Sequence, residues 1–313
     1  MTTGFVYDPL FLEHDTGIGH PERAARLRAI HERLQASGLA DELDVVAPSE
    51  VPLERLERVH ARGYPDALRT QIEGRSGRLS DGDTVVSPGS WRAALHAAGG
   101  ACDAVTRVCE ATWKAGFVAA RPPGHHAEAD QAMGFCLFNN AAVAARHAQD
   151  AHGLERVAVI DWDVHHGNGT QHIFEDDPSV FYASLHQWPL YPGTGAASER
   201  GRAEGEGATL NCPQEPGSGD VEWIGALETQ VLPALEAFAP QIVIVSAGFD
   251  AHADDPLAGA RVSTAGFERM SELVLDFARE RCEGRFVSLL EGGYDIDALA
   301  ASVEAHLRAL RSS

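Results

Sequence analysis

The chain has 313 residues, of which 44% are hydrophobic and 23% charged, so it has enough apolar material for a core and is neither disordered nor collagen-like. Asp and Glu outnumber Lys and Arg by 46 to 25, and the resulting net charge of −21 argues against direct binding to nucleic acid or an anionic membrane. The same charge favours encounter with cationic substrates.

Helical spacing of apolar residues predicts six helices, near residues 21–38, 89–111, 139–151, 221–238, 264–282 and 295–310. Between them lie five short runs that are apolar on both faces, at 116–120, 156–160, 180–185, 241–246 and 285–290. Such alternation is typical of an α/β fold whose multi-stranded, mainly parallel sheet has helices on both faces. No linker or repeat divides the sequence, so we expect one domain over residues 1–313, with the glycine-rich stretch 193–219 as a surface loop.

The five cysteines are far apart and form no C-x-x-C pair, which indicates free thiols in a reducing compartment. The sequence has no leader-like start, and no apolar run approaches the roughly 18 residues of a membrane span. We therefore expect a cytoplasmic protein with no membrane partner.

Polar clusters follow each of the five predicted strands. They contain His125-His126, Asp161 to Gly169, His186, Gly248 to Asp250, and Glu291 to Tyr294. Because the carboxyl ends of parallel strands open onto one crevice, we expect these clusters to meet there.

Asp161, Asp163 and His165 are spaced at i, i+2 and i+4, and because side chains alternate along a strand we expect all three to project to one side. Asp163 and His165, with Asp250 from another strand end, would give three protein ligands, the pattern of a catalytic zinc site. The alternative is that the two acids cap the following helix while His165 hydrogen-bonds a loop.

The adjacent pair His125-His126 offers a general base and an electrostatic partner beside such a metal. Asp161 and Asn168 are the candidates to hold the tautomers of the two rings. The competing interpretation is a turn with two satisfied histidine side chains.

Three aromatic residues on predicted loops are further candidates. Tyr294 follows two glycines and could donate to the oxyanion of a tetrahedral intermediate, although Gly-Gly-Tyr is also common in turns. Phe135 and Tyr191 could wall a narrow apolar channel, or simply pack.

Taken together, the motifs resemble the zinc-dependent histone deacetylase and acetylpolyamine amidohydrolase superfamily, in particular its class II-like, bacterial-type branch. The resemblance covers nearly the whole chain. It is carried, in order, by Gly17-Ile-Gly-His-Pro-Glu-Arg, Ser87-Pro-Gly-Ser-Trp, Arg121-Pro-Pro-Gly-His-His-Ala, Gly134-Phe-Cys-Leu-Phe-Asn, Asp161-Trp-Asp-Val-His-His-Gly-Asn-Gly-Thr-Gln, Ser184-Leu-His, Ser246-Ala-Gly-Phe-Asp, Asp255-Pro-Leu and Leu290-Glu-Gly-Gly-Tyr.

The resemblance implies an arginase-like α/β fold and an amidohydrolase that removes acetyl groups from N-acyl-lysine side chains or similar amines. It implies Zn²⁺, with Fe²⁺ as an alternative, on Asp163, His165 and Asp250. His126 would act as general base and then acid on a metal-activated water, and Tyr294 would polarise the carbonyl. It also implies that His125, backed by Asp161, is the electrostatic partner of His126. Asn168, a neutral residue where class I members carry an acid, is the partner usual in class II.

For the substrate, the resemblance implies a tunnel flanked by Phe135 and Tyr191, with the Gly134 carbonyl as an acceptor. Tyr191 stands where many histone deacetylases have Phe. It further implies a structural monovalent cation, usually potassium, held by Asp161, Asp163, His165, Ser184 and Leu185.

An acetylated lysine peptide or protein is the implied substrate, and an acetylated polyamine is the alternative. Leu257 stands where polyamine-selective members have a glutamate, and the segment 71–90 lacks their long insertion. Both departures argue against strict polyamine specificity.

Two other classes compete. Asp250-Ala-His252-Ala-Asp254 matches the pattern of binuclear manganese ureohydrolases of the arginase type, but that chemistry has no role for His125-His126 or Tyr294, so we expect His252 and Asp254 at the rim. A non-enzymatic acyl-lysine-binding module would lack at least one catalytic group, and none is missing here.

Overall fold

A computed structural model describes residues 2–311, and its centre is a sheet of eight strands in the order β2-β1-β5-β10-β9-β6-β7-β8. Every neighbouring pair in this sheet is parallel. The strands are β1 (Thr2–Val6), β2 (Asp44–Val46), β5 (Trp113–Val118), β6 (Val157–Asp161), β7 (Val180–Gln187), β8 (Thr209–Gln214), β9 (Ile242–Ala247) and β10 (Phe286–Leu290). The predicted α/β class with a mainly parallel sheet is confirmed.

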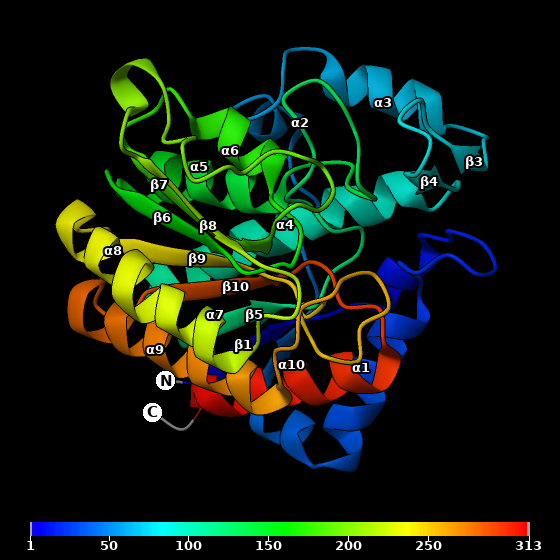
Figure 1. The fold of residues 1–313 in the computed structure, drawn as a ribbon. Coiled ribbons are helices and arrows are strands. Elements are labelled where there is room, and N and C mark those ends of the chain that lie inside the picture. Colours follow the sequence, from blue (N-terminus) through cyan, green and yellow to red (C-terminus); the bar gives the residue numbers. More distant parts are fainter. Residues whose placement is uncertain (1, 312–313) are drawn as a thin grey trace.

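Helices cover both faces of the sheet, as Figure 1 shows, with α4, α5 and α6 on one side and α1, α9 and α10 on the other. The helices are α1 (Ala25–Ala36), α2 (Leu53–Leu56), α3 (Tyr64–Ile72), α4 (Ser90–Cys109), α5 (Asn140–His152), α6 (Asn168–Phe174), α7 (Asp220–Ala226), α8 (Leu232–Phe238), α9 (Thr264–Arg281) and α10 (Ile296–Arg311). A small antiparallel hairpin of β3 (Gly77–Arg78) and β4 (Val85–Val86) lies beside α3.

The central strands form where the sequence is apolar on both faces, because both faces of the sheet are covered. Every residue of β6, β9 and β10 is buried. At the edges the pattern differs, since no residue of β2 is fully buried. The expectation of a loop over 193–219 was wrong in part, because β8 lies within it and pairs with β7 along six residues. This edge strand was not predicted because it contains the polar Asn211 and Gln214 and, between them, Pro213.

The predicted helix over 221–238 is divided. Between α7 and α8, residues Leu227–Val231 form a turn of π-helix, and Pro233 lies in the first turn of α8. Proline has no N–H to donate, so a regular helix cannot run unchanged through this position.

His306 of α10 is a fully buried polar residue of the core. Its two ring nitrogens lie 2.6 Å from Ser271 Oγ and 2.8 Å from Ser288 Oγ, so both are hydrogen-bonded to neutral groups. Burial lowers the pKa of His306 to about 3, which keeps the ring uncharged.

The structure also bears on membrane spans and on the cysteines. Over residues 2–311, no helix is both long enough and apolar enough to span a bilayer. The five cysteines, all within this range, are free thiols.

Candidate active site

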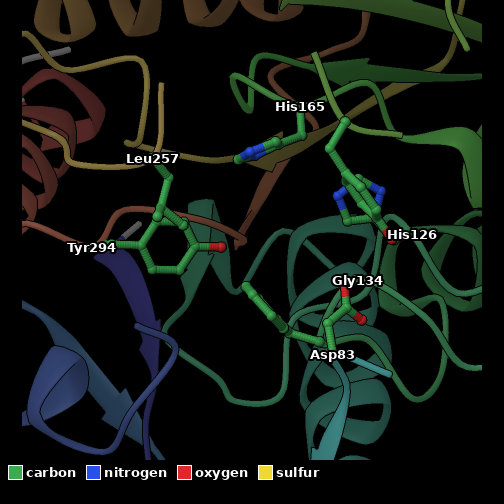
Figure 2. A pocket seen from close by; sticks show the side chains of 8 residues that line it. Asp83, His126, Gly134, His165, Leu257 and Tyr294 are labelled. Atoms are coloured by element: carbon green, nitrogen blue, oxygen red, sulfur yellow. The ribbon is translucent and has the colours of Figure 1, made fainter. Parts of the chain in front are cut away.

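A narrow cavity of about 100 Å³ opens at the carboxyl-terminal side of the sheet. It is smaller than the ~300 Å³ at which pockets for drug-sized ligands begin, so it suits a slender chain. Figure 2 shows the Tyr294 hydroxyl pointing into it, across from His126. The lining residues are Asp83, His126, Gly134, Phe135, His165, Tyr191, Leu257 and Tyr294.

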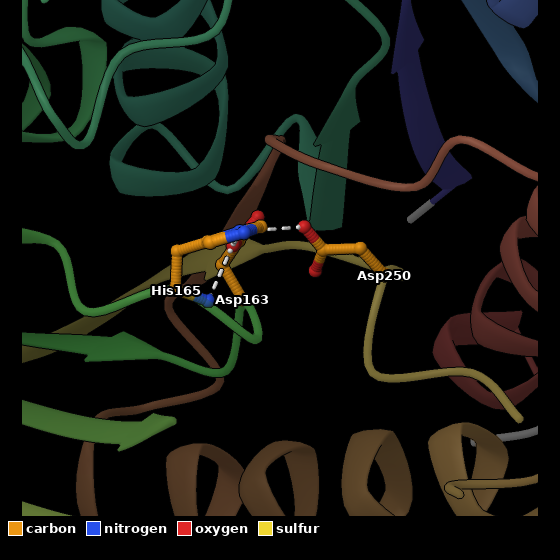
Figure 3. Close-up of side chains that lie close together, drawn as sticks. All are labelled: Asp163, His165 and Asp250. Carbon is orange, nitrogen blue, oxygen red and sulfur yellow. Dashed lines mark hydrogen bonds and ion pairs between the residues drawn. The ribbon is translucent and has the colours of Figure 1, made fainter. Parts of the chain in front are cut away.

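At the floor of this region, Asp163, His165 and Asp250 are buried together (Figure 3), with one donor atom of each within 4.8 Å of the others. His165 Nδ1 lies 3.1 Å from an oxygen of each carboxylate. Asp163 and His165 follow β6, and Asp250 follows β9, the neighbouring strand. The strand-end positions predicted from the sequence therefore do bring these three side chains together.

The common direction of these side chains does not come from strand alternation, as the spacing had predicted. Strand β6 ends at Asp161, so Asp163 and His165 do not alternate along a strand. Instead, Asp161 Oδ1 accepts the N–H of Asp163, and Asp163 Oδ1 accepts the N–H of His165, at 3.1 and 2.9 Å. The alternative, in which the two acids cap the following helix, does not hold, because α6 has no side-chain cap.

Backbone N–H groups fix both carboxylates of the cluster. Val164 N–H donates to Asp250 Oδ1 at 2.9 Å, and Gly292 N–H donates to Asp163 Oδ2 at 2.7 Å. Gly292 has no room for a side chain, because a Cβ there would lie 2.1 Å from Asp250 Oδ2. Such hydrogen bonds set the direction of a carboxylate lone pair, as at metal centres.

The cluster has the electrostatics of a cation site. Burial opposes the charged form of His165, yet its hydrogen bonds to Asp163 and Asp250 raise its pKa to about 10. Burial and the Asp163 carboxylate raise the pKa of Asp250 to about 7. Two buried carboxylates therefore need positive charge nearby, and one nitrogen with carboxylate oxygens is a donor set that suits Zn²⁺ or Fe²⁺.

His125 and His126 are buried side by side, with ring centroids 4.0 Å apart. His125 Nδ1 lies 3.0 Å from Asp161 Oδ2, and His126 Nδ1 lies 2.7 Å from Asn168 Oδ1. The structure thus places each ring beside the partner proposed from the sequence.

The two rings differ in charge. Burial opposes charging of His125, but Asp161 and Asp163 raise its pKa well above the usual range. Burial and the neighbouring His125 and His165 lower the pKa of His126 well below it. The cationic His125 is thus suited to an electrostatic role, and the neutral His126 is suited to accept a proton.

The loop after β10 presents Tyr294. Its N–H donates to Asp255 Oδ2 at 2.7 Å, and burial, together with Asp250 and Asp163, raises the pKa of its phenol. Arg26 is a residue that sequence reasoning missed: its guanidinium lies 5.1 Å from the Tyr294 ring centroid and donates to Gly293 O at 2.6 Å.

The opposite wall is formed by Gly134 and Phe135. Gly134 has a φ of +56°, and a Cβ there would lie 2.4 Å from Cδ2 of His126, so the chain passes directly against that ring. Phe135 has a φ of +69°, and its N–H donates to Thr84 Oγ1 at 3.1 Å. This backbone is held in place by the segment between β3 and β4.

At the mouth, Tyr191 and Leu257 are 40% and 37% exposed. The Tyr191 ring meets His126 edge to face at 5.2 Å between centroids. Asp83 was also missed by sequence reasoning, although it lines the cavity. Burial and the neighbouring Asp81 raise the pKa of Asp83 to about 6. The only signal for it in the sequence is Asp81-Gly-Asp83, an ordinary turn pattern.

Of the five residues expected around a monovalent cation, Asp161, Ser184 and Leu185 lie on adjacent strands, and the other two follow the end of β6. Asp161 of β6 pairs in register with Ser184 of β7, and Leu185 follows it. All five of these residues are buried: Asp161, Asp163, His165, Ser184 and Leu185.

His252 and Asp254 do not join the cluster. His252 Nε2 pairs with Thr264 Oγ1 at 3.2 Å, and the Asp254 side chain is 74% exposed. Within residues 2–311, the one group of three side chains with metal-binding geometry is Asp163, His165 and Asp250.

Comparison with known proteins gives the family. The model of the histone deacetylase domain matches residues 20–310, more than nine-tenths of the chain. The chain belongs to the histone deacetylase family. Every residue of the site described above lies inside the matched histone deacetylase domain, including the three of the acidic cluster.

Two relatives and one solved structure illustrate the similarity. A probable deacetylase of Archaeoglobus fulgidus is 38% identical over 299 residues, which cover 95% of this chain and 82% of that protein. Histone deacetylase 14, chloroplastic, of Arabidopsis thaliana is 40% identical over 307 residues, which cover 93% of this chain and 73% of that protein. A solved crystal structure of the HDA15 HD domain superposes with a TM-score of 0.94 at 42% identity, covering 99% of this chain and 88% of that one.

Proposed function

We propose that this histone deacetylase family member is a metal-dependent amidohydrolase that removes acetyl groups from acylated lysine side chains. The observation that carries the proposal is one narrow cavity lined by Tyr294, by a neutral buried His126 and by His165, a member of the acidic cluster. A ureohydrolase of the arginase type finds less support, since His252 pairs with Thr264 and the Asp254 side chain is exposed.

A divalent ion, proposed as Zn²⁺, would be held by Asp163, His165 and Asp250 and would supply Lewis-acid polarisation of the acyl carbonyl and a more acidic water. His126, neutral because of its burial, takes the proton of the attacking water and later passes it to the leaving amine. The cationic His125 stabilises the negative charge that develops, and Asp161 holds it.

Tyr294 donates its O–H to the carbonyl oxygen as that oxygen becomes negative. Its raised pKa keeps the phenol protonated, so the donor is present at neutral pH. We therefore expect Tyr294→Phe to lower kcat by about 100-fold or more, because a single oxyanion donor is lost.

The walls support a linear aliphatic chain as the substrate arm. Phe135 and Tyr191 line this small cavity, and Gly134, which passes against His126, is proposed to offer its carbonyl to the substrate. Asp83 and the net charge of −21 favour a cation at the mouth, which keeps an acetylated polyamine as the second candidate.

Leu257 provides the test between these substrates. An acidic side chain there would pair with a polyamine amine, so we expect Leu257→Glu to raise kcat/KM for acetylspermidine about 10-fold relative to an acetyl-lysine peptide. Leu257→Gln is the control for size. Equal changes for Glu and Gln would contradict a charge-based preference.

We also propose a structural K⁺ beside the cluster, held by Asp161, Asp163, His165, Ser184 and Leu185, partly through backbone oxygens. It is supported by the pairing of buried Asp161 with buried Ser184. Replacing K⁺ by the larger, weakly bound tetramethylammonium should lower the melting temperature, and identical melting curves in the two salts would refute the proposal.

The deciding experiment is acetate release by zinc-loaded protein from an acetyl-lysine peptide, acetylputrescine, acetylspermidine and a trifluoroacetyl-lysine peptide. Wild-type activity on the peptides that Tyr294→Phe loses would support the lysine deacetylase. Preference for the acetylpolyamines would favour the second candidate, and inactivity on all four would refute both.

A further inference from the structure

The hydrogen-bonded chain from His126 does not end at Asn168. Asn168 is 2% exposed and begins α6, and its Nδ2 donates to Glu128 Oε1. The same carboxylate oxygen lies 2.8 Å from Nδ1 of His172, one turn along α6. His172 is 37% exposed at its side chain and Glu128 20%, so the chain runs from the cavity to the surface.

Asn168 can face His126 with either its oxygen or its nitrogen, and the two choices have opposite consequences. With Oδ1 toward the ring, Nδ1 of a neutral His126 must carry the proton, and Nε2 is left as the acceptor. With Nδ2 toward the ring, Nδ1 must accept, and the proton moves to Nε2. A general base at the cavity needs the first arrangement.

Glu128 decides between these orientations, because a carboxylate only accepts hydrogen bonds. The Asn168 amide nitrogen must therefore face Glu128, and its oxygen must face His126. The other neighbours of Asn168 Nδ2, His126 O and Met133 Sδ, are also acceptors and favour the same orientation, but both lie farther away, at 3.4 Å.

Glu128 is itself fixed at its backbone and at its carboxylate. Its carbonyl accepts from His60 Nδ1 at 2.9 Å, and its N–H donates to Gln131 O at 2.9 Å. At the other end, the bond to Glu128 raises the pKa of His172, with further contributions from Glu175 and Glu199. The carboxylate thus lies between two donors from the same helix.

We propose that Glu128 is a positioning residue that acts through Asn168 to keep the proton of neutral His126 on Nδ1, leaving Nε2 as the acceptor for the cavity. This inference rests on the proposed function for its kinetic consequence, whereas the position of the proton is a property of the folded protein. Glu128 touches neither the cavity nor the acidic cluster.

The first test measures the proton directly. In zinc-loaded protein with ¹⁵N-labelled histidine, the ring nitrogen shifts of His126 should show Nδ1–H in the wild type. In Glu128→Ala, a substantial Nε2–H population should appear. An unchanged His126 spectrum in that variant would overturn the proposal, whether or not the protein hydrolyses any amide.

The second test is kinetic and uses the trifluoroacetyl-lysine peptide. Glu128→Ala should lower kcat about 10-fold, the scale of losing a partner that orients a site residue, with KM and zinc content unchanged. Glu128→Gln is isosteric, and its amide oxygen can still accept from Asn168, so it should recover most of that loss. A Gln variant as slow as the Ala variant would overturn a role in orientation.

A double-mutant cycle shows whether Asn168 is the link. In the Asn168→Ala background, adding Glu128→Ala should change kcat by less than about 2-fold, whereas independent effects would multiply. Glu175→Gln is the control, because it removes a neighbouring charge of His172 that makes no bond to Asn168. Multiplying effects would refute the proposal, and wild-type inactivity with the expected spectra would refute only the proposed function.

Discussion

Buried histidines occur in two contrasting regions of this molecule. In the core, His306 lies between two serine hydroxyls and against the rings of Phe117 and Phe249, and its pKa falls to about 3. At the carboxyl ends of the strands, His165 is 9% exposed, lies between two carboxylates, and has a pKa of about 10. Burial acts in the same direction on both rings, so the partners decide the charge.

The contrast explains which region can hold chemistry. Both ring nitrogens of the core histidine are hydrogen-bonded to hydroxyl groups, so the ring requires no further ligand. The acidic cluster gathers two carboxylates where desolvation is expensive, and it becomes stable only with a cation or protons among them. A buried group that is costly without a ligand is the expected signature of a binding site rather than of packing.

Removal of the metal should therefore have the largest effect, and it should act on the acidic cluster and not on the core histidine. Chelation should abolish acetate release completely, and Zn²⁺ should restore it, because Asp163, His165 and Asp250 lose the ion that they are proposed to hold. Unfolding monitored in urea should also move to lower concentration in the apo protein. Full activity after exhaustive dialysis against chelator, with no metal detected by mass spectrometry, would contradict a metal-dependent site.

The next effect in size should come from His126. We expect His126→Ala to lower kcat by about 10²- to 10⁴-fold, the range of general acid–base catalysis, with zinc content unchanged. The ring is not among the cluster ligands, and its centroid lies 6.0 Å from that of His165. Loss of zinc from this variant would instead make His126 a ligand.

The fold was predictable in most places where burial dominates the sequence pattern, although the buried inner strand β1 was not predicted. The strands β6, β9 and β10 are apolar throughout because helices cover both of their faces, and they were found from that signal. The edge strands carry no such signal. The residues of β2 are at least partly exposed, and β8 includes Asn211 and Pro213, which read as loop residues in isolation.

The site residues that follow strand ends were predictable from the sequence, whereas the residues that hold them in position were less so. Asp163, His165 and Asp250 stand out because acids and histidines rarely end buried strands without a reason. Glu128 and Asp83 could not be recognised, since an acid on a loop is ordinary until the fold brings it to Asn168 or to the cavity. Directions of side chains beyond β6 depended on turn hydrogen bonds that no periodicity encodes.

The smallest expected effect is the contribution of His306 to the pH dependence of the free energy of unfolding. The folded pKa of His306 is about 3, below the ordinary value of 6.5, so between these values the unfolded chain binds a proton that the native state does not. Its contribution to stability is thus complete above pH 6.5 and is lost as the pH falls toward 3. His306→Phe removes this dependence while Ser271 and Ser288 keep their backbone acceptors, Phe267 O and Gly116 O.

Urea unfolding of the wild type and His306→Phe at pH 7.5 and 5.5 measures this proton. From the higher to the lower pH, the wild type should lose about 1 kcal/mol more unfolding free energy than the variant, because one additional proton binds to its unfolded state. The other histidines, including those of the site, titrate equally in both proteins and cancel in the difference. Equal losses would mean that His306 takes up its proton in the native state. Burial and hydroxyl partners would then not be sufficient to keep a core histidine neutral, and the contrast with His165 would fail.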